Sequence, residues 1–143
     1  MSLPTLTLSF YHVAYEPVPP VLCGSSLRPV SAEEVTASCE LLLATAQRHG
    51  CAYWLLDGRH HEREQPQALH DWMQEEYFPR VRATLGRLPC VAFMVQPFVW
   101  AGLIAKGYDQ PQDWQTPNVR MGWFTDEAAA RAWLNRLRDL ETI

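Results

Sequence analysis

The chain has 143 residues, of which 48% belong to the apolar set and 20% are charged. This is the composition of one globular domain, and it excludes disordered and collagen-like chains. Lysine and arginine number 12 against 16 aspartates and glutamates. The resulting net charge of −4 and the lack of a basic cluster argue against a nucleic-acid partner.

The chain opens with two strands. Residues 5–15 (TLTLSFYHVAY) alternate loosely and are rich in Thr, Val, Phe and Tyr, which predicts a strand. Prolines at 17, 19 and 20 form a stiff connection, and residues 21–27 form a short second strand paired with the first. We expect the first strand to run antiparallel at or near an edge of the sheet.

A helix follows over residues 31–50. Ser31 is a hydroxyl N-cap with Glu34 three residues later, which is the pattern of a capping box. Gly50 is a suitable residue to end the helix. Spacings of four, three and four place one set of apolar residues on a single face: Val35, Cys39, Leu42 and Ala46.

The middle of the chain predicts a buried strand and a second helix. Residues 51–56 (CAYWLL) form a continuous apolar run, typical of a parallel strand covered on both faces. Asp57 and Gly58 end it, and residues 59–65 form a polar loop. Pro66 fits the first turn of a helix that should finish by Gly86, with a kink or restart at Pro79.

The last third predicts two more strands and a helix. Residues 90–96 form a buried strand, and 119–124 form the last strand. Between them we expect an irregular region, apolar over 98–105 (FVWAGLIA) and polar over 106–118. Thr125 or Asp126 caps the final helix, whose inner stripe consists of Ala130, Trp133, Leu134 and Leu137.

Helices between successive strands imply parallel pairing and right-handed crossovers. The sequence therefore predicts a single α/β domain over residues 1–143. Its mostly parallel mixed sheet should have about five strands with flanking helices, in the order β-β-α-β-α-β-β-α.

Several short motifs in this order resemble the STAS-like superfamily, the fold of the anti-sigma-factor antagonists. They are WLLD at 54–57, FTDEA at 124–128 and AWL at 132–134, and EEYFP at 75–79 is similar to a helix of a group of uncharacterised bacterial proteins. The resemblance implies a non-enzymatic module that works by binding protein partners. Signalling members carry a phosphorylated serine after the Leu-Asp strand. Residues 58–64 contain no Ser or Thr, so that switch is not carried over.

Polar residues follow three of the predicted strands. Since ligands bind at the carboxyl ends of strands in open α/β sheets, we expect a ligand or partner rim there. Its members are Asp57, Gly58, Arg59, His60, His61, Gln96, Thr125 and Asp126. In the alternative interpretation, Asp57 caps a turn, Arg59 pairs with it, and the histidines are solvated.

The segment 98–105 has more apolar surface than an ordinary loop, so it either tucks under the domain or covers a partner subunit. We expect the second, a contact between two copies of the chain. The residues expected in this homodimer contact are Phe98, Val99, Trp100, Leu103 and Ile104. A small-ligand-binding domain at the rim and an enzyme of unrecognised class stay open as alternatives to an interaction module.

We expect no catalytic residue, no cofactor and no native metal. His60, His61 and His70, with Glu62 and Glu64, match no metal-ligand spacing. The segment from Cys23 to Arg28 superficially resembles the cysteine–arginine loops of phosphatases. Pro29 removes a donor that such a loop needs, so Cys23 is expected to be an ordinary strand residue.

The compartment is expected to be the cytoplasm. The first ten residues have no basic stretch and contain Pro4, unlike a signal peptide. Four cysteines without a CxxC pair indicate reduced thiols. Residues 88–105 carry no charge, but Pro89, Pro97 and Gln96 argue against a transmembrane helix.

Overall fold

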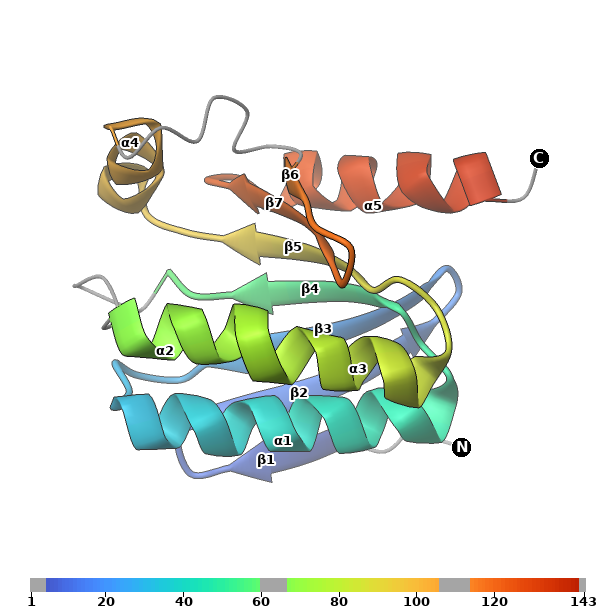
Figure 1. Cartoon of the computed structure of the whole chain (residues 1–143), viewed down its shortest axis with the longest axis horizontal. Helices are drawn as coiled ribbons and strands as arrows, with labels where there is room; N and C mark the ends of the chain where they lie inside the picture. The colour runs from blue at the N-terminus through green and yellow to red at the C-terminus, as the bar shows by residue number, and fades with distance from the viewer. Residues whose placement is uncertain (1–4, 60–66, 106–113, 142–143) are drawn as a thin grey trace.

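The computed structural model describes residues 5–59, 67–105 and 114–141. Within these ranges, seven strands form one sheet in the order β1-β2-β3-β4-β5-β7-β6 (Figure 1). The strands are β1 (Thr5–Leu8), β2 (Tyr11–Pro17), β3 (Pro20–Ser26), β4 (Tyr53–Asp57), β5 (Cys90–Met94), β6 (Trp114–Gln115) and β7 (Arg120–Phe124). The helices are α1 (Ala32–His49), α2 (Gln67–Trp72), the π-helical turn η1 (Met73–Tyr77), α3 (Phe78–Leu85), α4 (Pro97–Ala105) and α5 (Glu127–Glu141).

The α/β prediction is confirmed. Strands β3, β4, β5 and β7 pair in parallel at the centre of the sheet, with Trp54 opposite both Leu22 and Val91. The apolar runs that predicted β4 and β5 are buried almost throughout. Two short strands extend the sheet beyond the expected count, because β1 and β6 each add an antiparallel edge.

The predicted first strand is divided in two. Leu8 pairs with Tyr11, so Ser9 and Phe10 form a tight turn and the chain folds back on itself. β2 then pairs antiparallel with β3 as expected. The sequence of residues 5–15 does not indicate this turn, because Ser-Phe carries none of the Gly, Asn or Pro signals that mark most hairpins.

Helix α1 is built as its sequence predicts. The Ser31 hydroxyl accepts from the Glu34 backbone N–H, and the Glu34 side chain accepts from the Ser31 N–H. At the other end Gly50 has a φ of 62°, and its N–H caps the carbonyls of Ala46 and Gln47. A side chain at Gly50 would be strained in this left-handed conformation.

The second helix contains the disturbance predicted near Pro79. Residues Met73–Tyr77 form a π-helical turn between α2 and α3, and Pro79 lies in the first turn of α3. A proline has no N–H for the preceding turn, so the helix widens immediately before it. The Tyr77 hydroxyl donates to the Cys39 carbonyl at 2.6 Å, which ties this helix to α1.

The prediction of an irregular region over residues 98–105 was wrong. Residues 97–105 form the helix α4. Pro97 occupies the first position, where its missing N–H and fixed φ suit a helix start. Val99 and Trp100 donate to the Gln96 carbonyl at 3.0 and 3.3 Å and begin the helical hydrogen bonding.

Helices cover both faces of the sheet. A Cβ at Gly24 of β3 would lie 3.0 Å from Leu42 of α1, whereas the preceding residue, Cys23, lies 3.9 Å from Arg131 of α5. Neighbouring residues of a strand point to opposite faces, so α1 and α5 lie on opposite sides. The core is covered on the α5 side by Ala130, Trp133, Leu134 and Leu137, the predicted inner stripe.

None of the described helices is both long and apolar enough to span a bilayer. The four cysteines are free thiols, three of them buried and Cys23 half-buried.

Candidate functional site

The described rim residues lie together at the carboxyl ends of the parallel strands. β4 ends at Asp57, β5 at Met94 and β7 at Phe124. Just beyond the strands, the Gly58 N–H donates to the Met94 carbonyl at 2.8 Å, and the Val95 N–H donates to the Phe124 carbonyl at 2.8 Å. These bonds continue the ladder and fix the rim backbone.

Asp57 and Arg59 are bonded to each other. The Arg59 side chain donates from two nitrogens to the two carboxylate oxygens of Asp57, at 3.0 and 2.9 Å. The Arg59 backbone N–H adds a third bond to Asp57 Oδ1 at 3.0 Å. The Gln96 side chain donates to the Arg59 carbonyl at 2.7 Å, which joins the ends of β4 and β5. This is the turn and ion pair of the alternative interpretation.

Thr125 and Asp126 lie on the same edge, after β7. Asp126 is the cap of α5, since its carboxylate accepts from the Ala129 N–H at 3.0 Å. Bonding to Asp57 is the main cause that raises the pKa of Arg59, and the fields of Glu127 and Asp126 add to it. The acidic start of α5 therefore lies near the Asp57–Arg59 pair. His60 and His61 fall outside the described residues.

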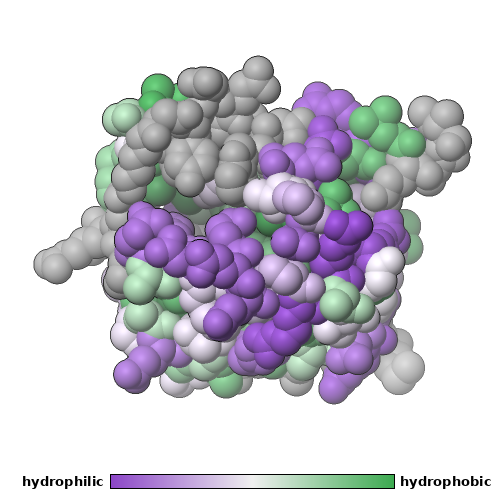
Figure 2. All heavy atoms as spheres, in the orientation of Figure 1, coloured by the Kyte–Doolittle hydropathy of each residue, from purple (hydrophilic) through white to green (hydrophobic). Residues whose placement is uncertain are grey.

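Helix α4 lies beyond the carboxyl end of β5, at one corner of the molecule (Figure 1). Its nine residues carry no charge, and 45% of both Phe98 and Ile104 is exposed. Val99 and Trp100 are half-buried. The side chain of Leu103 is outside the described part of the structure. Figure 2 shows hydrophobic side chains at this corner, whereas hydrophilic ones dominate the front of the molecule.

Cys23 lies in strand β3 and not in an anion-binding loop. Its thiol donates to Glu16 Oε2 at 3.3 Å, and Arg131 forms a two-pronged bond to the same carboxylate at 3.0 and 3.1 Å. Burial first, and then the Glu16 carboxylate, raises the pKa of Cys23 to about 12. This thiol is therefore protonated and unreactive at neutral pH.

Among the residues whose placement is described, no group of three His, Cys, Asp or Glu side chains is arranged to hold a metal ion. Four polar rim side chains bond to one another or to the backbone: Asp57, Arg59, Gln96 and Asp126. The Cys23 thiol, with its raised pKa, is not activated as a nucleophile.

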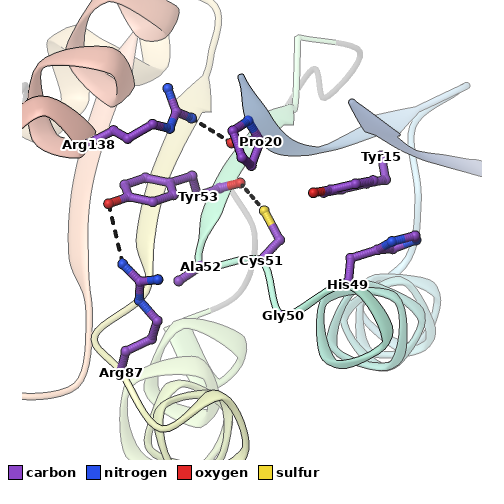
Figure 3. Close-up of a pocket in the computed structure, with 9 residues that line it drawn as sticks. All are labelled: Tyr15, Pro20, His49, Gly50, Cys51, Ala52, Tyr53, Arg87 and Arg138. Atoms are coloured by element: carbon purple, nitrogen blue, oxygen red, sulfur yellow. Dashed lines mark hydrogen bonds between the residues drawn. The ribbon is translucent and has the colours of Figure 1, made fainter. Parts of the chain in front are cut away.

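The sequence did not indicate a pocket at the other end of the parallel strands. It lies at the amino ends of β4 and β5 and includes Arg87 and Arg138 (Figure 3). Its residues come from β2, β3, α1, β4, the segment before β5, and α5, so no local spacing could reveal it.

Comparison with protein-family models, with curated proteins and with solved structures finds no match to this chain. The STAS-like kinship therefore stays a prediction.

Proposed function

We propose that this protein is a non-enzymatic interaction module that pairs with a second copy of itself through α4. The observation that carries the proposal is an uncharged helix that exposes 45% of both Phe98 and Ile104. Fully burying an exposed large apolar side chain contributes about 1.5–3 kcal/mol, so covering the exposed part of each of these two side chains contributes about half of that. Scattered exposed apolar residues are ordinary, but two on one short uncharged helix indicate an interface.

A second copy suits this helix better than a partner with a charged surface. A two-fold contact joins the same surface of both subunits. Because α4 carries no charge, its contact with α4 of a second copy brings no two like charges together. The net charge of −4 lies outside α4, so the repulsion between two copies is weakened by distance and by salt. Stable interfaces bury roughly 800 Å² per partner, more than one nine-residue helix exposes. We therefore expect a reversible dimer with a Kd in the micromolar range.

The proposal rests on α4 and not on the rim. Asp57 and Arg59 neutralise each other, and Gln96 holds the Arg59 carbonyl. A ligand would have to break this pair before it could use either charge. The STAS-like kinship and a cytoplasmic location are parts of the same proposal. Four free thiols favour the latter, because such thiols persist in a reducing compartment.

Sedimentation equilibrium from about 1 to 200 μM tests the proposal. The wild-type chain should pass from monomer to dimer within this range, whereas Ile104→Asp should stay monomeric because it places a charge in the contact. Leu140→Asp is the matched control, since Leu140 is 57% exposed on α5. It should dimerise like the wild type.

Two results would refute the dimer. One is a wild-type chain that stays monomeric throughout the range, and the other is an equal loss of dimer in Leu140→Asp. Thermal melts of both variants show whether each still folds, which separates a lost contact from a lost structure.

A further inference from the structure

The pocket at the amino ends of β4 and β5 has the size of a small-molecule site. Its volume is about 630 Å³, and nine residues line it (Figure 3). They are Tyr15, Pro20, His49, Gly50, Cys51, Ala52, Tyr53, Arg87 and Arg138. Binding cavities for organic ligands occupy roughly 300–1,000 Å³. The pocket therefore has room for a ligand of several ring or chain atoms.

The described lining is cationic in a chain that is acidic overall. It contains Arg87 and Arg138, and none of its nine residues is an Asp or Glu. The last turn of α1 also borders the pocket, and the partial negative charge of its carbonyl oxygens disfavours a bound anion. Those of Ala46 and Gln47 are occupied by the Gly50 N–H.

Arg138 is held by neutral groups. It donates to the Pro20 carbonyl at 2.5 Å and to Asn135 Oδ1 at 2.6 Å, and its guanidinium lies 4.7 Å from the centre of the Tyr53 ring. Within the described residues it forms no bond to a carboxylate, and its Nε is buried without a hydrogen-bond acceptor. Its position is fixed while its charge is not neutralised.

Tyr53 brings a second guanidinium to the same place. Arg87 lies 5.5 Å from the centre of the Tyr53 ring and donates to the Tyr53 hydroxyl at 3.4 Å. The guanidinium groups of Arg87 and Arg138 therefore both border the Tyr53 ring. Guanidinium groups suit carboxylate and phosphate oxygens because their donors form a planar fork.

The other side of the pocket is a wall formed by two aromatic rings (Figure 3). The rings of Tyr15 and His49 stack with centres 4.0 Å apart and an angle of 9° between their planes. His49 Nε2 is buried and has no hydrogen-bond partner among the described residues. The wall gives the apolar part of a ligand a surface to lie against, at the opposite end of β4 from the strand-end rim (Figures 1 and 3).

We propose that this pocket binds a small organic anion, with its carboxylate or phosphate on Arg138 and its apolar part against Tyr15. The site is separate from α4 and does not depend on dimer formation. It would make the module responsive to a metabolite-sized ligand.

Isothermal titration calorimetry at a fixed ionic strength of about 0.1 M tests the site with phenyl phosphate, benzoate and inorganic phosphate. Either aromatic anion should bind with a Kd of about 1 mM or tighter, and comparing the two distinguishes a phosphate from a carboxylate ligand. Inorganic phosphate should bind more weakly, because it lacks the apolar part. Arg138→Gln should weaken binding about tenfold or more, as expected for a lost charged hydrogen bond.

Arg136→Gln is the matched control, since it removes the same charge from an exposed position of α5 outside the pocket. It should change the Kd by less than about twofold. Tyr15→Leu on the opposite wall is a second test if Arg138→Gln fails to fold, and it should weaken the aromatic probes most. No binding of any probe at about 10 mM would overturn the site. So would equal weakening by Arg136→Gln, or binding that neither pocket variant changes.

Discussion

Gly24 shows how one residue sets the spacing between β3 and α1. A Cβ at this position would clash with the Tyr11 hydroxyl and lie 3.0 Å from Leu42. Tyr11 and Leu42 are both buried in the core. The glycine therefore provides the room in which the Tyr11 ring lies between the sheet and the helix.

Gly24→Ala should destabilise the fold by about 1–3 kcal/mol, because the methyl group overpacks this contact. Urea denaturation measures the loss. Tyr11→Phe removes the nearest atom, so Gly24→Ala should cost less in a Tyr11→Phe background than in the wild type. An equal cost in both backgrounds would show that the hydroxyl is not what excludes the methyl group.

Cys23 is the second residue whose chemistry follows from its neighbours. With a pKa of about 12, fewer than about one thiol in 10⁴ is ionised at pH 7.4. Iodoacetamide should therefore label Cys23 in the native protein far more slowly than a free cysteine, and at the ordinary rate in urea. Rapid native labelling of Cys23 would show that burial and the Glu16 carboxylate do not suppress its ionisation.

Among the secondary-structure elements, helix α1 begins with a charged cluster that responds to acid. Bonds from Arg28, followed by those from the Ser31 backbone, lower the pKa of Glu34 to about 2. A lowered carboxyl pKa contributes stability that is present above the ordinary value of 4.5 and is lost as the pH falls towards 2.

The Glu34 carboxyl should titrate near pH 2 in a ¹³C NMR experiment. Arg28→Gln should move its midpoint up towards the ordinary value, because it removes the largest cause of the shift. Glu33→Gln alters the neighbouring carboxylate outside the capping box and should leave the Glu34 titration in place. A wild-type midpoint near 4.5 would contradict the observed bonding.

The elements differ in how readily the sequence predicts them. α1 and α5 bury one stripe each, so a helical period is visible in their residues. α4 is apolar along its whole length, and such a run looks the same in a helix, a strand or a buried loop. Only Pro97, as a first helical residue, distinguishes the helix. β1 lies within the strand predicted over residues 5–15, and only the turn after Leu8 was not indicated. β6 has two residues and is too short to show a period.

Across the whole molecule, the sheet separates two regions of different chemistry. The carboxyl edge carries the Asp57–Arg59 pair and α4, and the amino edge carries the cationic pocket. The strand-end rule predicted that Asp57, Gln96 and Asp126 share an edge, because it depends only on strand direction. The strand-end rule could not predict that Asp57 pairs with Arg59.

The rule also could not predict the pocket. Arg87 and Arg138 are far apart in the sequence, and only folding brings both of them next to the Tyr53 ring.

Hydrogen–deuterium exchange at two protein concentrations is the sharpest test of pairing through α4. If α4 is the surface through which two copies meet, the amides of residues 97–105 should exchange more slowly at about 200 μM than at about 1 μM, while those of the β2–β3 hairpin should not change. Exchange in α4 that is independent of concentration, or protection that develops on another element, would contradict it.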